Sequence, residues 1–382
     1  MKLDKSKLNE SLLYALRKGN TQQVRRLIQR GADIDAGDEE DRPVLYWAVR
    51  RGDVSMVRLL LKHGPRLDFV TGAVDDTVLI TAVRRRNLPA VKLLALRTLL
   101  NEPNAEGRTP VHVAVVERQP EILEYLLTKG AEPGFADHDH ATPLALAARI
   151  GDDRSLDILL KRLPIDYWEV GGRDEKHHTF RVGGMTALHA AAEGGNFGVV
   201  WELLDRGAYV RACDDAGWSP LHYACYCNNA DAARELIKAG ALLWAPDGNG
   251  DAPLVVGAIT CATDAMKVLI DALKDEFDIE KWGLSNSESV RLQNQFRDMV
   301  NEALCEAVRR DRLDVGRDPE RPHSKTKFLH EFRKRQEPTV RMLLAEGANP
   351  SSPAPGGTAR EIAARNGNEA ALKVFDETAA ER

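Results

Sequence analysis

A unit of about 33 residues recurs along this chain of 382 residues, and this period constrains the fold more than any other feature. Each unit has an apolar stripe at helical spacing, then a turn, then a second helical run that ends near a glycine. In the unit that begins at Thr186, Leu188 and Ala191 belong to the first helix and Leu203 to the second. Two helices of this length cannot bury their own apolar faces, so neighbouring units must stack.

The alanine at the centre of each first helix fixes the register. Six of the nine gaps between successive copies are within one residue of 33, and the other three are 44, 50 and 56. The long gaps predict three insertions, near residues 164–184, 276–300 and 311–337. The equivalent positions are Ala15, Ala48, Ala82, Ala114, Ala147, Ala191, Ala224, Gly257, Ala307 and Ala363.

Short motifs at the start of the first helices identify the type of repeat. They are Thr109-Pro-Val-His112, Thr142-Pro-Leu144, Thr186-Ala-Leu-His189 and Ser219-Pro-Leu-His222. In these motifs and in its period the chain resembles the ankyrin-repeat family. The resemblance implies an all-α solenoid of paired antiparallel helices joined by β-turns, filling residues 1–382. Its ten repeats would start near residues 9, 43, 77, 109, 142, 186, 219, 252, 302 and 358.

Cysteine content and the pattern of apolar residues favour an intracellular protein. The start of the chain, Met1–Leu8, has no apolar core of a secretory signal, and no run is long enough to span a bilayer. The five cysteines are odd in number, which fits reduced thiols better than a disulfide framework. We therefore expect a cytoplasmic or nuclear location and no contact with a membrane.

The sequence offers little evidence for catalysis. It has no Walker-type phosphate loop and no Gly-x-Ser-x-Gly elbow, so we expect no catalytic residue and no cofactor. Asp137-His-Asp-His140 has potential metal ligands, but adjacent turn residues point apart, so we expect no metal. His112, His189 and His222 occupy one repeat position, which indicates a structural role. The family resemblance implies bonds to the neighbouring hydroxyl and to the backbone of the next repeat.

Basic residues recur just after the central alanine of the first three repeats. Arg17, Arg50 and Arg84 stand there, each followed by another Lys or Arg. Residues 1–100 hold 19 Lys and Arg against 12 Asp and Glu, whereas the whole chain has a net charge of −5. The stripe indicates a groove for an acidic segment of a partner protein. The alternative is a simple preference for cations at helix C-termini.

Aromatic residues give a second indication of a binding surface. Trp47 and Tyr223 precede the central alanine of their repeats, Trp218 and Trp244 lie in or beside turns, and Tyr226 follows on a helix. Exposed Trp and Tyr are enriched at binding hot spots. The alternative is that some of these rings only cover neighbouring repeats.

The resemblance implies a non-catalytic scaffold or adaptor that binds another protein on its concave face. A first alternative is an enzyme or effector with active residues in the region 276–336. A second is nucleic-acid binding through the arginine stripe, which the acidic net charge disfavours. The segment Arg309–Arg335 holds ten Lys and Arg against five Asp and Glu, so it is a solvated loop, a nuclear-import patch or a nucleic-acid contact.

Overall fold

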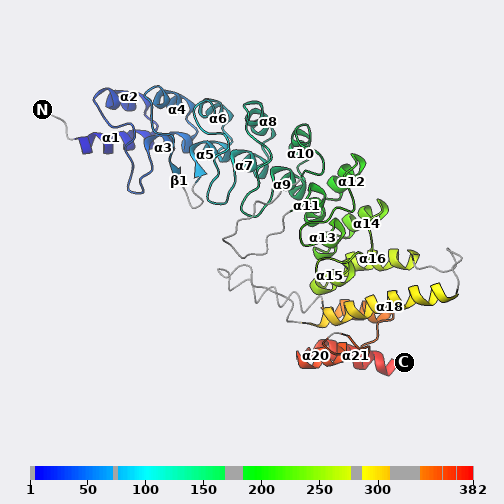
Figure 1. Cartoon of the computed structure of the whole chain (residues 1–382). Coiled ribbons are helices and arrows are strands. Elements are labelled where there is room, and N and C mark those ends of the chain that lie inside the picture. The colour runs from blue at the N-terminus through cyan, green and yellow to red at the C-terminus, as the bar shows by residue number, and fades with distance from the viewer. Residues whose placement is uncertain are drawn as a thin grey trace. The chain divides into compact units, whose positions relative to one another are not determined.

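The computed structural model describes residues 5–71, 76–167, 184–276, 286–309, 336–354, 356–366 and 368–381. The chain divides into two compact units, Met1–Arg181 (unit 1) and Val182–Arg382 (unit 2). Both consist of helix pairs, as Figure 1 shows, which confirms the all-α class and the paired helices expected from the period. In the described ranges, no helix has the length and apolarity that a membrane span needs.

Unit 1 stacks its helix pairs in two rows (Figure 1). The first helices pack on one another in sequence order, and so do the second helices. The first helices are α1 (Lys5–Lys18), α3 (Val44–Arg51), α5 (Val78–Arg84), α7 (Pro110–Val116) and α9 (Pro143–Ile150). The second helices are α2 (Thr21–Gln29), α4 (Val54–Leu61), α6 (Leu88–Leu94), α8 (Pro120–Thr128) and α10 (Asp153–Leu160). A short antiparallel pair, β1 (Val70–Thr71) and β2 (Asp76–Thr77), precedes α5.

Unit 2 begins with three pairs of the same kind. They are α11 (Ala187–Gly194) with α12 (Phe197–Asp205), α13 (Pro220–Tyr226) with α14 (Ala230–Lys238), and α15 (Pro253–Thr260) with α16 (Thr263–Glu276). Gly257 replaces the central alanine in α15 because a Cβ there would lie 2.9 Å from Cγ of Met266. The unit continues with α18 (Asn286–Val308), a helix over residues 336–345, α20 (Ala359–Arg365) and α21 (Glu369–Glu381).

The predicted insertions fall largely outside the described residues. Residues 168–183 and 310–335 hold most of the first and the third. In the second, α16 continues to Glu276 and α18 begins at Asn286, then packs along α15. Gln336, at the end of the third, is buried and donates a hydrogen bond of 2.8 Å to the Ala307 carbonyl. The division of residues 1–382 into ten repeats stays a prediction.

Most first helices of the regular repeats end at a residue in the left-handed conformation. Glycine stands there at Gly19, Gly52, Gly151 and Gly195. Where the sequence has no glycine, the backbone keeps the same turn: Arg86, Arg118, Asn228 and Cys261 have φ between 52° and 59°. Such residues cost about 1 kcal/mol each in local strain, so stacking of the repeats holds the turn against local preference.

The recurring histidines connect successive repeats. Nδ1 of His112 accepts a hydrogen bond from the backbone N–H of Thr109 and lies 2.9 Å from its hydroxyl. Nε2 therefore carries the proton, and it donates to the Ala141 carbonyl of the next repeat at 3.2 Å. His189 and His222 repeat the arrangement. Burial lowers the pKa of His112 and of His189 to about 4, so these rings are neutral and structural, as expected.

Candidate functional site

The loop before a first helix, here called the finger loop, is built on one polar side chain. One oxygen of that side chain accepts hydrogen bonds from the backbone N–H groups of the residues two and four positions later. These two bonds close the turn. In the aspartates the second carboxylate oxygen is left to accept bonds from outside the turn. The residues in this role are Asp38, Asn104, Asp137, Asp214 and Asp247.

The second carboxylate oxygen of Asp38 accepts hydrogen bonds from two cationic side chains and one aromatic side chain. Arg17 donates to it at 3.1 Å, Arg42 at 2.9 Å and the indole N–H of Trp47 at 3.2 Å. Burial opposes ionisation of the Asp38 carboxyl, but the bonds from Arg42 and from the turn outweigh it and lower its pKa to about 2. Arg17 and Arg42 also lie over the Trp47 ring, each 4.9 Å from a ring centroid.

Arg50 completes this group, here called the arginine–tryptophan cluster (Arg17, Arg42, Trp47 and Arg50). Its guanidinium lies 5.3 Å from a centroid of the Trp47 ring and donates to the Tyr46 hydroxyl at 3.0 Å. The side chain is exposed, and among the described residues no carboxylate lies within ion-pair distance of it. The cluster thus holds three guanidinium groups around one ring and leaves one of them without a carboxylate.

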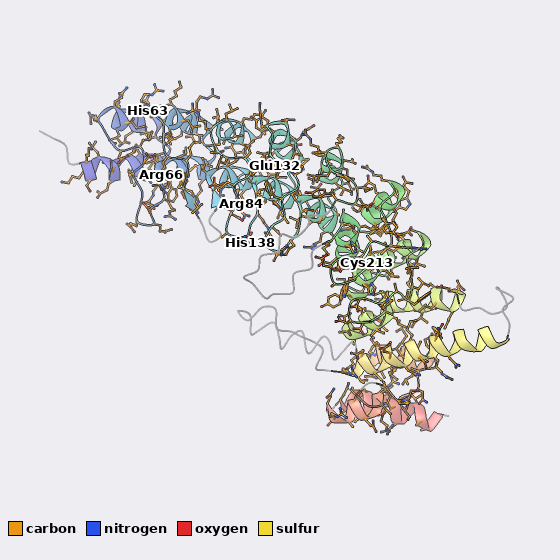
Figure 2. All side chains as sticks on the ribbon, in the orientation of Figure 1. His63, Arg66, Arg84, Glu132, His138 and Cys213 are labelled. Atoms are coloured by element: carbon orange, nitrogen blue, oxygen red, sulfur yellow. The ribbon has the colours of Figure 1, made fainter. Side chains whose placement is uncertain are left out.

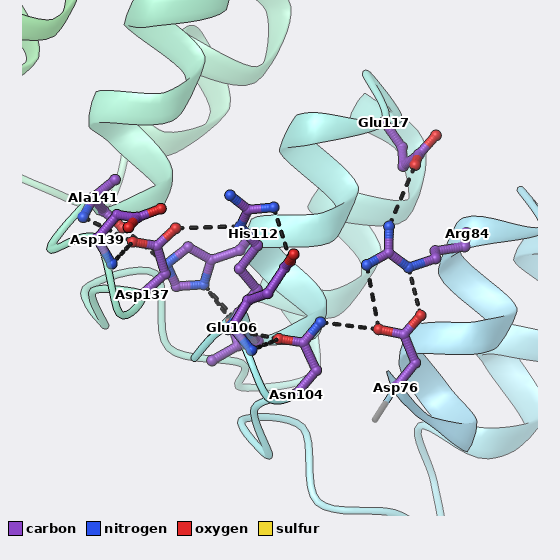
Figure 3. Close-up of polar contacts among 11 residues, drawn as sticks. Asp76, Arg84, Asn104, Glu106, His112, Glu117, Asp137, Asp139 and Ala141 are labelled. Carbon is purple, nitrogen blue, oxygen red and sulfur yellow. Dashed lines mark hydrogen bonds and ion pairs between the residues drawn. The ribbon is translucent and has the colours of Figure 1, made fainter. Parts of the chain in front are cut away.

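Arg84, the third predicted arginine, lies in a separate and more neutral environment (Figure 3). Its guanidinium donates to both oxygens of the buried Asp76, at 3.3 Å for the longer bond, and lies 3.8 Å from Glu117. Burial disfavours the charged guanidinium, but the bond and charge of Asp76 outweigh it and raise the pKa of Arg84. Asn104 donates to Asp76 as well, at 2.9 Å. Arg84 therefore already has carboxylate partners within the chain.

Figure 2 places Arg84 and His138 on the finger-loop side of unit 1 and His63 on the side of the second helices. Among the described residues, which include His138 and its neighbours, no group of three possible metal ligands converges. The carboxylate of Asp137 instead closes its turn and pairs with Arg108, whose Nε lies 3.2 Å from it.

In unit 2 three of the predicted aromatic residues come together. The ring centroid of Trp218 lies 5.1 Å from that of Tyr223 and 5.3 Å from that of Tyr226, both edge to face. Trp218 donates its indole N–H to Asp247 at 2.9 Å, and the Tyr223 hydroxyl donates to Asp214 at 2.7 Å. Tyr226 is 46% exposed.

Trp244 does not join this group. It follows α14, is 52% exposed, and donates its indole N–H to Glu276 at the end of α16, at 3.2 Å. Among the other exposed aromatic residues, which the predicted site did not include, Phe197 and Trp201 lie together on α12. The signal that would have revealed them is their spacing of four residues outside the apolar stripe of that helix. Arg42 was missed because only its contact with Asp38 shows its role.

Comparison with known proteins identifies the class. A family model described as ankyrin repeats (many copies) matches residues 12–61 and 188–237, and one described as ankyrin repeats (3 copies) matches residues 68–137. Over these three stretches the chain therefore consists of ankyrin repeats. Two solved ankyrin-repeat domains are similar: that of Bcl-3, 26% identical with a TM-score of 0.47 over 59% of this chain and 96% of that one, and that of human ASB11, 22% identical with a TM-score of 0.48 over 60% and 98%.

Three curated relatives illustrate the range of proteins that carry similar repeats. NF-kappa-B inhibitor alpha of Sus scrofa is 35% identical over 30% of this chain and 34% of that protein. The B-cell lymphoma 3 protein homolog of Mus musculus is 33% identical over 36% and 31%. The putative palmitoyltransferase ZDHHC13 of Danio rerio is 26% identical over 54% and 31%. The chain spans about a third of the length of these relatives.

Proposed function

We propose that this chain is a non-catalytic protein-recognition module, and that its arginine–tryptophan cluster binds an acidic segment of a partner protein. The observation that carries the proposal is the state of Arg50. Its guanidinium is exposed, is placed by the Trp47 ring and the Tyr46 hydroxyl, and has no carboxylate partner among the described residues. A carboxylate of the partner segment would accept a charge-assisted hydrogen bond from the Arg50 guanidinium.

The other members of the cluster support this role differently. Arg17 and Arg42 share Asp38, so they contribute net positive charge but already have one acceptor. Trp47 is only half-buried and gives a partner segment an apolar surface beside the cations. Arg84 belongs to the predicted site by position, but its pairing with Asp76 leaves it less able to bind a partner.

The test uses a short fluorescein-labelled peptide of alternating Glu and Gly, titrated with the full chain while fluorescence anisotropy is recorded. Arg50→Glu should weaken binding at least about fivefold, because surface ion pairs contribute about 1 kcal/mol and the reversal adds repulsion. Trp47→Ala should mainly speed dissociation. Binding should weaken as salt is raised.

The matched control is Arg58→Glu, an equal charge change at an exposed position of α4. If Arg58→Glu weakens binding as much as Arg50→Glu, the attraction is diffuse and the cluster is not a site. A short single-stranded DNA of equal charge, tested in parallel, separates protein recognition from the nucleic-acid alternative. Binding of the DNA and not of the peptide would contradict the proposal.

The enzymatic alternative concerns the region 276–336, of which residues 277–285 and 310–335 lie outside the described residues. One relative bears the name of a putative palmitoyltransferase, but the chain matches only 31% of it. The five cysteines are free and three of them are buried, which fits a reducing compartment such as the cytoplasm or nucleus. Burial raises the pKa of Cys225 to about 12 and that of Cys305 to about 11, so neither thiol is suited to act as a nucleophile.

A further inference from the structure

The finger-loop side of unit 2 differs in charge from that of unit 1. No Lys or Arg occurs in residues 212–233 or 239–266, which contain the finger loops and first helices of two successive repeats. Those loops hold the carboxylates of Asp214, Asp215 and Asp247. Among the described residues, no cation lies within ion-pair distance of any of the three.

A neutral aromatic donor stands in unit 2 at a position where unit 1 has an arginine. In unit 1, Arg108 reaches across 29 residues to donate to Asp137 in the next finger loop, at 3.2 Å. In unit 2, Trp218 reaches across 29 residues to donate to Asp247, at 2.9 Å. An indole N–H satisfies the hydrogen bond but leaves the negative charge uncompensated.

Asp214 shows the consequence of this exchange. Burial raises the pKa of its carboxyl, against the hydrogen bonds from Tyr223 and the turn, and the charge of Asp215 raises it further. A carboxylate in this position is stabilised by an added cation. The exposed edges of the aromatic cluster lie beside it, since Tyr223 contacts both Asp214 and Trp218.

We propose that this surface, formed by Asp214, Asp215, Trp218, Tyr226 and Asp247 and here called the acidic–aromatic surface, binds an Arg- or Lys-rich segment of a partner protein. Asp215 is exposed and would accept charge-assisted hydrogen bonds from the segment, whereas Asp214 and Asp247 are buried and would contribute their negative charge. The Trp218 and Tyr226 rings would contact the cations of the segment. The site is distinct from the arginine–tryptophan cluster and takes a ligand of opposite charge.

The test uses a short fluorescein-labelled peptide of alternating Arg and Gly, titrated with the full chain by fluorescence anisotropy. Trp218→Arg, which installs the residue type of Arg108, should weaken binding about tenfold, because it adds a cation and removes a ring. Asp215→Asn should weaken it about threefold. Asp215 is exposed and makes no described side-chain hydrogen bond, so this variant should fold normally.

Asp205→Asn, at an exposed position of α12, is the matched control and should bind the peptide as the wild type does. The proposal is overturned if Asp205→Asn weakens binding as much as Asp215→Asn, or if Trp218→Arg binds as the wild type does with an unchanged melting temperature. It is also overturned if the peptide of alternating Glu and Gly competes for the same surface. Arg50→Glu should leave binding of the Arg peptide unchanged, so this proposal can fail independently of the proposed function.

Discussion

Asp38 in unit 1 and Asp214 in unit 2 close their finger loops in the same way, but their surroundings shift the pKa of the two carboxyls in opposite directions. Both close the turn with one oxygen, and both accept from an aromatic residue nine positions later, Trp47 or Tyr223. Arg17 and Arg42 both donate to Asp38, and the bonds from Arg42 and from the turn outweigh burial and lower the pKa of Asp38 to about 2. Asp214 has no cation beside it in the described part of the chain, and burial raises its pKa.

The difference shows that one repeat backbone can present either charge at the same place. The turn needs a hydrogen-bond acceptor but not a counter-ion. The residues around the second carboxylate oxygen of the turn aspartate can therefore differ in charge from one repeat to the next. Arginines there give unit 1 a basic cluster that is partly neutralised within the chain. Aromatic N–H and O–H donors there give unit 2 an acidic surface beside exposed rings.

The largest expected effect comes from reversing a charge that unit 1 uses internally. Arg84→Glu would set a carboxylate against the buried Asp76 and against Glu117. Breaking a pair of this kind costs about 3 kcal/mol. We therefore expect the free energy of unfolding, measured by urea denaturation, to fall by roughly that amount.

Arg85→Glu is the control for this variant, since Arg85 is exposed and has no described side-chain partner. It should change the free energy of unfolding by less than about 0.5 kcal/mol. Equal stability of the two variants would show that the Asp76–Arg84 pair contributes nothing and that unit 1 is not neutralised internally.

Mild acid should affect unit 2 more than unit 1. The pKa of His189 is about 4 in the folded chain against 6.5 when unperturbed, so its contribution is complete above pH 6.5 and is lost as the pH falls toward 4. At about pH 5 this is a loss of about 2 kcal/mol. Unit 2 adds His222, whose pKa burial also lowers, whereas in the described part of unit 1 the buried histidine of this kind is His112. Asp214 acts in the opposite direction, because a raised pKa favours the folded state as it protonates.

Hydrogen exchange measured by mass spectrometry at about pH 7 and pH 5, corrected for the intrinsic rates, can separate the two units. Amides of α11 and α13 should lose more protection than those of α3 and α5. His138→Gln, at an exposed histidine, should leave this pattern unchanged. A greater loss of protection in unit 1 would contradict the assignment of these histidines.

The smallest effect tests the two aspartates directly. Asp38→Asn removes a charge that two arginines stabilise, so it should lower the free energy of unfolding at neutral pH by about 1 kcal/mol. Asp214→Asn keeps a turn acceptor and removes a charge that has no described counter-ion, so it should be neutral or slightly stabilising. Thermal unfolding of the two variants side by side gives the comparison. A larger loss for Asp214→Asn would show that a cation lies near it after all.

The sequence predicted the features that depend on short-range patterns. The period located the helix pairs, because apolar residues must recur at helical spacing for each pair to stack on the next. The recurring His112, His189 and His222 pointed to a structural role, which their bonds and burial confirm. Even the absence of glycine at Arg86 or Cys261 did not change the turn, because the register of the stack fixes it.

The tertiary structure alone decided which charges meet. Arg17, Arg50 and Arg84 stand at one position of the repeat, yet their partners differ. Arg17 pairs with Asp38, Arg84 pairs with Asp76, and Arg50 contacts the Tyr46 and Trp47 rings in the described part of the chain. These partners come from loops that differ between repeats and from side chains far away along the chain, such as Asp247, which lies 29 residues from Trp218. The energy of each pair depends on direction, distance and loss of solvent, and a linear pattern of residue types contains none of these.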